Sequence, residues 1–356
     1  MTREMKQNKT HIWFFLGNGM GSLLCALHAV ETAWFGVPKE KRGKCIILVT
    51  REESMYRDIV AMYSHVIILR ISFKNFFELL SIFVHTITDI HLVFHPISFG
   101  EHNIYFKLYS KFITIWNKES ENIGAVPDTW LNRFFYSKII RRDLTVSVFE
   151  LMERAVMSVM ETKKKKIDLL FQYDTALAKK LTSPYIVMHP YAANVARSLP
   201  MDRWIQIVEY VASVFDGIII ISGGPENYDE YRTLASRTMV PTQFIQNLAE
   251  GKIQNIIQII SGATIFIGVD TGVTHIANIL HKDCVVIGNR SNPCWLPTYN
   301  DKAVILSNPK NCTCEGNKKG GCFVVLEGVS YFRCMIDIEQ DTIYATIKNM
   351  LHLKTP

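Results

Sequence analysis

The stretch of sequence that decides the fold is Gly268-Val269-Asp270-Thr271-Gly272-Val273-Thr274-His275-Ile276-Ala277-Asn278. The apolar segment before it, residues 263–267, predicts a buried strand, and the apolar run after it favours a helix that ends near Leu280. The strand would deliver Asp270 and Thr271 to a turn, where Gly272 lets the backbone approach a ligand closely.

The start of this helix is suited to binding an anion. Its first N–H groups have no partner within the helix, so they would point outward beside small residues and favour a phosphate. His275 follows Thr271 by four residues, about one helical turn, so both side chains can reach the same ligand. The alternative is an ordinary strand-to-helix turn, with Asp270 or Thr271 as N-cap and His275 at the surface.

Apolar runs alternate with helix-compatible segments along most of the chain. In the first half we expect helices at 22–34, 55–62 and 73–85, between strands at 12–16, 45–50, 66–71 and 90–94. In the second half we expect strands at 185–188, 218–222, 244–246, 265–268 and 284–287. Strands rich in Ile, Val and Leu that are separated by helices predict parallel sheets covered on both faces.

The length of 356 residues favours two domains, and the 48% hydrophobic and 20% charged content is typical of a folded protein. Pro184 disfavours helix at the residue before it, so a second domain should begin there. We predict a first domain at 1–165, a linker at 166–183, a second domain at 184–340 and a C-terminal helix at 341–356.

The composition also limits the partners. No apolar run is long enough to span a membrane and no secretory leader is evident, so we expect a cytoplasmic protein. The net charge of +6 suits an anionic substrate or a membrane surface. The basic run Lys163–Lys166 is typical of a solvated interdomain stretch, with contact to anionic lipid headgroups as the alternative. Basic and aromatic residues are not interleaved in the way that binds nucleic acid.

Three further blocks accompany the opening stretch. A strand at 185–188 leads to His189-Pro190 and then to Arg197-Ser198-Leu199-Pro200-Met201-Asp202-Arg203-Trp204. A strand at 218–222 leads to Gly223-Gly224-Pro225-Glu226, and Cys334-Met335-Ile336-Asp337-Ile338 precedes the last helix. In this order the blocks resemble those of glycosyltransferase family 9, the bacterial heptosyltransferases and their relatives, over residues 185–351.

The resemblance implies the α/β fold called GT-B, in which two doubly wound Rossmann-like domains face each other across a cleft. It also implies an inverting glycosyltransferase without a catalytic metal, which takes a sugar from a nucleotide-diphosphate donor, ADP-heptose above all. The donor would bind the second domain and the acceptor the first. The acceptor would be a lipopolysaccharide core sugar or a protein hydroxyl, with possible peripheral contact to the inner membrane.

Charge builds on the departing diphosphate, so the donor site needs cations and oriented N–H groups. Arg197 matches the basic residue that the family places before the tryptophan, here Trp204. The N–H groups of Thr271 and Gly272 and the Thr271 hydroxyl would hold the phosphates beside Asp270, and His275 would add a hydrogen bond or a charge.

Gly223 and Gly224 allow close approach at the end of their strand. Glu226 would accept hydrogen bonds from a ribose, or else would cap the following helix. Pro200 fits the first position of the next helix. Trp204 is expected to pack in the core.

A glycine-rich loop, Gly17–Ser22, follows the first strand and precedes an apolar helix, so Gly19 and Gly21 can approach a ligand. Family members commonly carry an aspartate where this chain has Ser22, and that aspartate is taken as the base that deprotonates the acceptor. A serine cannot serve without help, so the base would be Glu52, His95 or Glu101. Otherwise leaving-group stabilisation would dominate, or the chain would be a non-catalytic nucleotide-sugar binder.

The same loop is half of a dinucleotide-binding fingerprint, with Glu52 as a candidate ribose ligand. Ser22 occupies the third glycine position, so the match is incomplete. A dehydrogenase would also leave the blocks at 223–226 and 270–272 without a role.

Four of the eight cysteines crowd residues 312–334, with the spacing C-x-C-x7-C-x11-C. Thiolates in a loop with little apolar content favour a structural metal, zinc or iron, bound by Cys312, Cys314, Cys322 and Cys334. Family relatives that heptosylate autotransporters carry similar clusters, and these imply iron and a protein acceptor. Free thiols or a redox-labile pair are the alternatives. Cys25, Cys45 and Cys284 should be core residues, and Cys294 a spare ligand.

Overall fold

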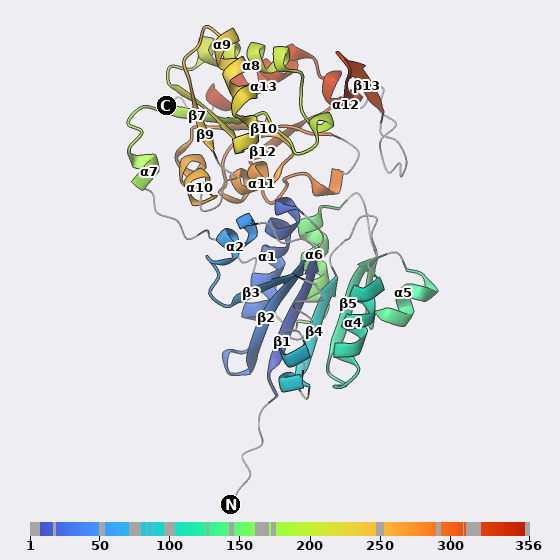
Figure 1. The fold of residues 1–356 in the computed structure, drawn as a ribbon. Helices are drawn as coiled ribbons and strands as arrows, with labels where there is room; N and C mark the ends of the chain where they lie inside the picture. Colours follow the sequence, from blue (N-terminus) through green and yellow to red (C-terminus); the bar gives the residue numbers. More distant parts are fainter. Residues whose placement is uncertain are drawn as a thin grey trace, which may run out of the picture. The chain divides into compact units, whose positions relative to one another are not determined.

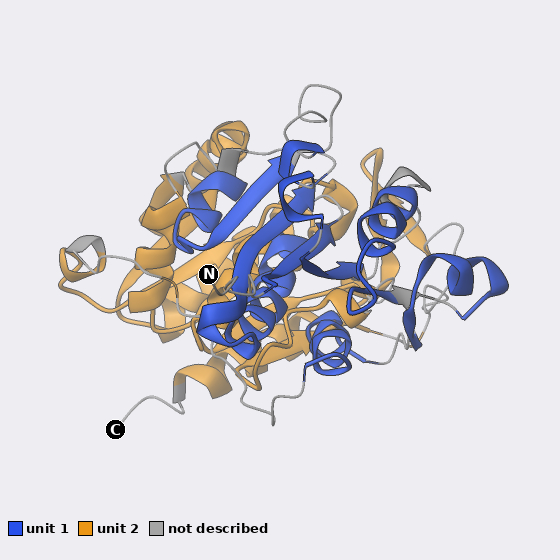
Figure 2. Ribbon diagram, turned by 90° about the horizontal axis from the view of Figure 1, so that it is seen from below, with its two compact units in different colours: residues 1–169 blue, residues 170–356 orange. Residues whose placement is uncertain are grey.

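The computed structural model divides the chain into two compact units, Met1–Leu169 and Leu170–Pro356 (Figures 1 and 2). It describes residues 8–16, 19–49, 54–70, 80–82, 84–87, 89–95, 104–126, 128–141, 146–160, 171, 176–246, 253–289, 293–308, 310 and 322–352. Within these residues, no helix is both long enough and apolar enough to cross a membrane.

The described strands of the first unit form one parallel sheet of six, in the order β3-β2-β1-β4-β5-β6. The strands are β1 (Thr10–Leu16), β2 (Arg42–Val49), β3 (Val66–Arg70), β4 (Ile90–His95), β5 (Glu121–Val126) and β6 (Lys138–Arg141). Every residue of the central strand β1 is buried, because helices cover both faces of a parallel sheet.

The described helices of the first unit are α1 (Met20–Gly36), η1 (Lys39–Lys41), α2 (Ser54–Val60), α4 (Ile104–Thr114), α5 (Trp130–Phe135) and α6 (Val148–Met157). Helix α1 is buried along most of its length and packs against β1 and α6. The predicted helix at 73–85 lies mostly outside the described residues.

The second unit has the same plan, with a described parallel sheet in the order β12-β11-β10-β7-β8-β9. Its strands are β7 (Tyr185–His189), β8 (Ile218–Gly223), β9 (Thr242–Gln246), β10 (Phe266–Val269), β11 (Cys284–Ile287) and β12 (Ala303–Leu306). An antiparallel hairpin, β13 (Phe323–Leu326) and β14 (Val329–Phe332), stands apart from this sheet.

The described helices of the second unit are α7 (Ala176–Lys179), η2 (Val195–Arg197), α8 (Met201–Val214), η3 (Pro225–Asn227), α9 (Tyr228–Arg237), α10 (Ile253–Gly262), α11 (Gly272–Ile279), η4 (Pro293–Trp295), α12 (Arg333–Ile336) and α13 (Gln340–His352). Helix α8 begins at Met201, so Pro200 is its N-cap and not its first residue as predicted. The difference of one residue is within the usual uncertainty of helix ends.

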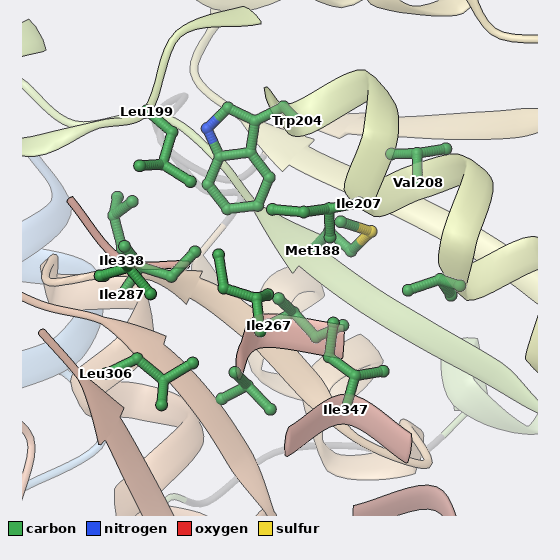
Figure 3. Close-up of a cluster of buried hydrophobic side chains, with 14 of the residues drawn as sticks. Met188, Leu199, Trp204, Ile207, Val208, Ile267, Ile287, Leu306, Ile338 and Ile347 are labelled. Atoms are coloured by element: carbon green, nitrogen blue, oxygen red, sulfur yellow. The ribbon is translucent and has the colours of Figure 1, made fainter. Parts of the chain in front are cut away.

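Trp204 lies in the apolar core of the second unit, as predicted (Figure 3). Its ring packs among residues from the sheet, from α8 and from the last helix, which include Met188, Ile267 and Ile347. Arg203, the neighbour of Trp204, reaches the C-terminal segment, where its guanidinium donates to the carbonyls of Ile336 (2.8 Å) and Ile338 (2.6 Å). These contacts fix helix α8 to the end of the chain.

Both sheets follow the strand order 3-2-1-4-5-6 when their strands are numbered along the chain, which is the order of dinucleotide-binding Rossmann folds. In this order the chain reverses its direction of winding between the first and fourth strands. The reversal falls between β1 and β4 in the first unit and between β7 and β10 in the second. Ligands of such sheets bind at the carboxyl ends of the strands beside this point.

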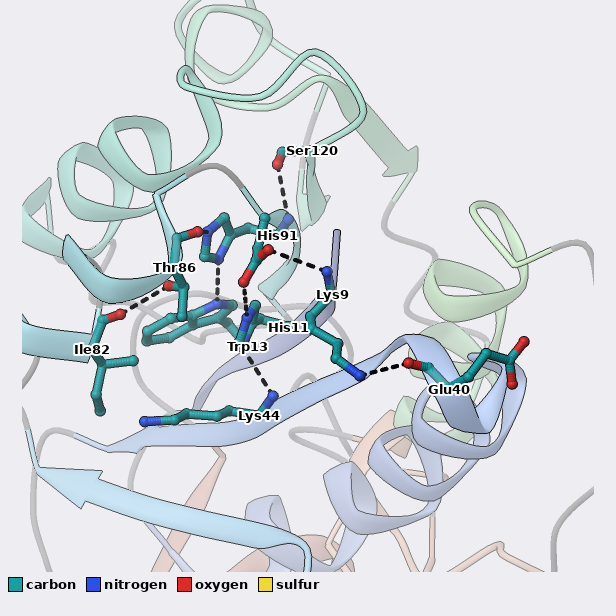
Figure 4. Close-up of polar contacts among 10 residues, drawn as sticks. Lys9, His11, Trp13, Glu40, Lys44, Ile82, Thr86, His91 and Ser120 are labelled. Carbon is teal, nitrogen blue, oxygen red and sulfur yellow. Dashed lines mark hydrogen bonds and ion pairs between the residues drawn. The ribbon is translucent and has the colours of Figure 1, made fainter. Parts of the chain in front are cut away.

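A cluster of buried polar side chains lies at the opposite, amino-terminal edge of the first sheet (Figure 4). The Trp13 indole donates to His91 Nδ1 (3.0 Å), and His91 Nε2 lies 3.0 Å from the Thr86 carbonyl oxygen. Similarly, the Lys44 backbone N–H donates to His11 Nδ1 (2.9 Å), and His11 Nε2 lies 3.0 Å from an Asp89 oxygen. Since Nδ1 accepts in both rings, both histidines carry their proton on Nε2 when they are neutral.

Candidate active site

The carboxyl ends of β7, β8 and β10 lie at one edge of the second sheet. The register pairs Gly268 with His189 and Met188 with Ile221, so the three strands end side by side. The three segments that follow them contain the predicted site residues 197, 223–226 and 270–275. The structure thus brings these segments to the reversal point of the sheet, where a ligand is expected.

The first segment is the turn from β10 into helix α11. Thr271 is the N-cap, but its side chain does not cap the helix. The Thr274 hydroxyl instead donates to the Val269 carbonyl (2.5 Å), which holds the turn to the end of its own strand. The first turn of α11 has no acidic side chain either. The amide groups at the start of α11, beginning with Gly272, are therefore not used by a side-chain cap and suit an anion.

Two titratable side chains flank this helix start. His275 Nε2 lies 4.0 Å from Asp270 Oδ1, and both side chains are buried. Burial lowers the pKa of His275 to about 4, although a hydrogen bond to the Trp295 carbonyl opposes the shift. His275 is therefore neutral near pH 7, so it can offer a hydrogen bond but not a charge. The alternative that places it at the surface is wrong.

Asp270 is linked to the second segment by charge. Burial raises the pKa of its carboxyl group to about 6, and the positive charge of Arg197 acts in the opposite direction. Asp270 and Arg197 are therefore close enough to interact electrostatically, although 73 residues separate them in the sequence. The helix start, the carboxylate and the guanidinium belong to one electrostatic site.

A tightly bonded loop positions Arg197 at the end of η2. The Asn194 side chain accepts from the Ala196 N–H (3.0 Å). The Ser198 hydroxyl donates to the Pro190 carbonyl (2.6 Å) and accepts from the Trp204 indole (3.3 Å). Within the described part of the chain, the Arg197 guanidinium itself has no hydrogen bond or ion pair. It is half-buried and available to a ligand.

The third segment follows β8. Gly223 leaves room for the ring of Tyr191, because a Cβ there would lie 2.9 Å from it. Gly224 leaves room for the Glu226 carboxylate, which a Cβ would meet at 2.2 Å. The Asn227 side chain accepts from the Gly224 N–H (2.9 Å), so Asn227 occupies the capping position that was the alternative for Glu226. Glu226 remains exposed at the strand end.

Sequence reasoning missed two side chains at this edge. His189 ends β7 and its Nδ1 donates to the Ser222 carbonyl (2.8 Å), which joins the ends of β7 and β8. Burial lowers the pKa of His189 to about 4. The hydroxyl of Tyr191 is buried and has no hydrogen-bond partner in the described residues. The pair His189-Pro190 at a strand end was the available signal, but the partner of His189 lies 33 residues away.

The glycine-rich loop of the first unit is described from Gly19 onward, and Gly17 lies outside the described residues. Gly19 is the N-cap of α1 with φ 111°, a conformation that favours glycine, and its N–H donates to the Tyr56 hydroxyl (2.5 Å). Gly21 and Ser22 lie in the first turn of α1. The loop therefore starts a helix as predicted.

Of the three candidate bases in the first unit, the structure describes only His95. His95 ends β4, where its ring stacks on Phe15 (4.5 Å between centroids) and meets the edge of Tyr136 (5.0 Å). It is buried between these rings, which restricts its access to an acceptor. Glu52 and Glu101 lie outside the described residues.

The cysteines are partly described. Cys25, Cys45 and Cys284 are fully buried, as predicted, and Cys294 is also buried. The hairpin β13–β14 brings the two described members of the cluster together, since the Arg333 N–H donates to the Cys322 carbonyl (2.8 Å) beside Cys334. Cys312, Cys314 and the basic run 163–166 lie outside the described residues. Among the residues that are described, no group of three or more metal-binding side chains is present.

The comparison with protein families shows which family the chain belongs to. The family model of glycosyltransferase family 9 (heptosyltransferase) matches residues 110–321, more than half of the chain. This chain belongs to glycosyltransferase family 9. The resemblance inferred from the sequence blocks is confirmed, and the protein is a glycosyltransferase. No curated protein matches its sequence.

Solved structures extend the likeness to the whole fold. A family 9 glycosyltransferase from Veillonella parvula is 12% identical, with a TM-score of 0.68 over 99% of this chain and 100% of that chain. The ADP-heptose lipopolysaccharide heptosyltransferase II of E. coli is 12% identical, with a TM-score of 0.68 over 97% and 99%.

The dodecameric iron-containing heptosyltransferase TibC of E. coli, solved with ADP-D-β-D-heptose, is 12% identical. Its TM-score is 0.56 over 100% of this chain and 79% of that chain. At these identities the likeness establishes the fold alone. The predicted α/β class with two Rossmann-like sheets, as in GT-B heptosyltransferases, is confirmed.

Proposed function

We propose that this glycosyltransferase moves a heptose from ADP-heptose to an acceptor hydroxyl with inversion at the anomeric carbon. The second unit would bind the donor and the first unit the acceptor. The donor is supported by the family and by the names of the similar structures, which include an ADP-heptose heptosyltransferase and a complex with ADP-D-β-D-heptose.

The main support for this proposal is the Arg197 guanidinium. It has no hydrogen bond or ion pair among the described residues, and it interacts electrostatically with Asp270 beside the uncapped start of α11. In the proposed reaction the acceptor hydroxyl oxygen attacks the anomeric carbon from the face opposite the diphosphate, and its proton passes to water or to the departing diphosphate. The bond from that carbon to the diphosphate oxygen breaks, and negative charge grows on the departing ADP. Arg197, the first amides of α11 and the Thr271 hydroxyl would stabilise that charge.

The other polar groups would support this arrangement. Attraction to Asp270 would hold the Arg197 guanidinium at the diphosphate, and neutral His275 would donate or accept a hydrogen bond. Glu226, exposed after β8, would accept hydrogen bonds from the ribose hydroxyls. This set of groups needs no divalent ion, since cationic and amide groups take its place.

Substitution of Arg197 by alanine tests the proposal. Loss of one group that stabilises the leaving charge should lower the rate of ADP release from ADP-heptose about 100-fold to 1,000-fold. Arg237→Ala is the matched control, because Arg237 is exposed and already pairs with the exposed Asp202 (2.6 Å). If Arg197→Ala releases ADP as fast as the wild type, the proposed mechanism is wrong.

A second candidate function is a nucleotide-sugar binder without catalysis. It is favoured by Ser22, which replaces the expected acidic base, and by the enclosure of His95 between Phe15 and Tyr136. Calorimetric binding of ADP-heptose, with no turnover on lipopolysaccharide core or on an autotransporter protein, would select this candidate. Turnover with either acceptor would identify the acceptor class.

The cysteine cluster is proposed to hold a structural zinc or iron ion. Cys334 is buried, and the Arg333 N–H donates to the Cys322 carbonyl (2.8 Å), which joins the backbones next to these two cysteines. Cys312 and Cys314 would complete four sulfur ligands, a set that suits either metal. The ion would fix the hairpin to the loop before it and would take no part in the transfer.

The protein is further proposed to act in the cytoplasm at the inner face of the membrane, where a glycolipid acceptor or an unsecreted protein acceptor would be available.

A further inference from the structure

Helices α4 and α5 of the first unit expose an unusual number of large apolar side chains. On α4 and just after it they are Leu108, Phe112, Ile115 and Trp116, and on α5 they are Trp130, Leu131 and Phe134. We call these seven residues the α4–α5 face. Trp130 is 81% exposed, Phe134 is 61% exposed, and the others are between 40% and 59% exposed.

The α4–α5 face is a single surface and not a set of scattered residues. Leu108 and Phe112 are four residues apart, so they share one side of α4, and Ile115 follows Phe112 by three residues just past the end of the helix. Phe112 meets Trp116 edge-on, with ring centroids 6.0 Å apart. Lys111 Nζ lies 5.8 Å from the centre of the Phe134 ring, which joins the two helices.

The inward side of α5 is already occupied, so its apolar residues cannot turn into the core. Asn132 and Phe135 are buried, and the Lys107 ammonium donates to Asn132 Oδ1 (3.0 Å). Thr129 caps the helix by accepting from the Asn132 N–H (3.3 Å). With inward contacts and cap both satisfied, Trp130 and Phe134 are held outward.

The size of the α4–α5 face calls for a partner. With about 200 Å² for each aromatic side chain, its four aromatic residues alone expose about 470 Å². That area lies within the range found for the largest apolar patch on a typical monomer, and such patches are often binding surfaces. The three aliphatic residues extend it further.

The charges around the face indicate the kind of partner. Every charged residue in α4 and α5 is basic: Lys111 and Arg133 are accessible, whereas Lys107 is buried. The described residues 104–126 and 128–141 contain six basic and three acidic residues, a net +3, which is half of the charge of the whole chain. One of these acidic residues, Asp128, is paired with Arg133 (2.7 Å).

We propose that the α4–α5 face docks on an anionic lipid surface. Tryptophan and phenylalanine suit the boundary between headgroups and acyl chains, and surrounding lysines attract anionic headgroups. A second copy of the chain fits less well, because a self-complementary contact would bring like charges together. The inference deepens the membrane contact of the proposed function.

Binding of the full-length protein to sedimented vesicles tests the proposal. The protein should sediment with vesicles of phosphatidylcholine plus phosphatidylglycerol, and much less with phosphatidylcholine alone. Trp130→Ser combined with Phe134→Ser should weaken the partition at least about tenfold. Lys111→Gln should weaken it by about fivefold, and added salt should reduce that difference.

Met239→Ser is the matched control, since Met239 is apolar and fully exposed but lies on the second unit. It should leave vesicle binding unchanged. If the α5 double variant does not fold, Phe112→Ser with Ile115→Ser on α4 replaces it. A thermal unfolding midpoint equal to that of the wild type establishes that either variant is folded.

Three results would overturn the proposal: no binding of the wild type to anionic vesicles, equal binding to neutral ones, or full binding by both double variants. Analytical ultracentrifugation without vesicles gives the molecular mass of the protein in solution. If the double variant has a lower mass than the wild type but binds vesicles equally well, the face is a contact between copies of the chain and the proposal is wrong. The assay uses neither donor nor acceptor, so vesicle binding and sugar transfer can fail independently.

Discussion

Two buried polar clusters, one in each unit, behave in opposite ways. At the amino-terminal edge of the first sheet, His11 and His91 have both ring nitrogens engaged, so the cluster is complete without a ligand. At the carboxyl edge of the second sheet, Asp270 has a raised pKa, and the Arg197 guanidinium has no hydrogen bond or ion pair among the described residues. The completed cluster stabilises the fold, whereas the incomplete one is the proposed donor site.

The largest expected effect concerns His91. Burial, with the nearby His11, lowers the pKa of His91 to about 4, whereas the unfolded chain binds a proton near pH 6.5. The unfolded state therefore holds more protons in this window, and stability falls as the pH drops from about 6.5 to 4. Between pH 7 and pH 4 this residue should cost about 3 kcal/mol of unfolding free energy.

His91→Gln should remove that pH dependence, because glutamine can accept from Trp13 and donate to Thr86 without titrating. Urea unfolding of the full chain at pH 7, 5 and 4 measures the effect. His85→Gln, at the surface of the same unit, is the control. If the unfolding free energy of His91→Gln depends on pH as steeply as that of the wild type, the pKa of His91 is not lowered in the folded protein as described.

The second prediction has the opposite sign. Burial raises the pKa of Asp270 from 3.8 to about 6, so the folded state holds an extra proton between those values and this carboxyl destabilises the fold above pH 6. Asp270→Asn should raise the unfolding free energy at pH 7.5 by up to about 3 kcal/mol, with a smaller gain near pH 4.

The same substitution should slow ADP release about tenfold, because Arg197 loses its electrostatic partner and one tenfold step corresponds to about 1.4 kcal/mol. Paired measurements of unfolding and ADP release on one preparation test both parts. A variant that is less stable and equally active would show that the second cluster is as structural as the first.

The smallest effect is expected for Ser198→Ala. The Ser198 hydroxyl donates to the Pro190 carbonyl and accepts from the Trp204 indole. Loss of these two hydrogen bonds should lower the unfolding free energy by about 1 kcal/mol. Because the loop that carries Arg197 would loosen, ADP release should also slow several-fold. Ser213→Ala, on exposed α8 surface, is the control for the loss of a hydroxyl. A change in stability alone would separate the loop from the chemistry.

The sequence predicted strands β1 to β4 and β7 to β11, including the edge strands β3 and β9, but it missed β5, β6 and β12. Strand β5, Glu121–Val126, contains Glu121, Asn122 and Gly124, so it lacks the apolar run that marks the others. Asn122 is nevertheless buried, because its side chain donates to Ser110 Oγ and to the Phe135 carbonyl. Strands β6 and β12 have four residues each and are only partly buried, whereas the equally short β10 and β11 are fully buried and were predicted. Polar residues or partial exposure weakened the sequence signal of the missed strands, which form through pairing with their neighbours in the sheet.

For the site, the sequence predicted which segments lie at strand ends, because each motif follows an apolar run. It could not predict that His275 is neutral or that His189 bonds to Ser222, since both facts depend on burial and on contacts between distant residues. The stacking of His95 on Phe15 is hidden for the same reason. The positions of the strands follow from local sequence patterns, whereas the protonation states of buried side chains depend on the folded core.

The turn of the β13–β14 hairpin sets a limit on how this region can change. Glu327 and Gly328 both have positive φ, 51° and 80°, as a two-residue reversal that matches strand twist requires. A single inserted residue on either arm would swap inner and outer faces and move position 322 out of step with position 333. We therefore expect the hairpin to tolerate insertions only when the same number of residues is added to β13 and to β14, since this keeps the pairing of the two strands in register.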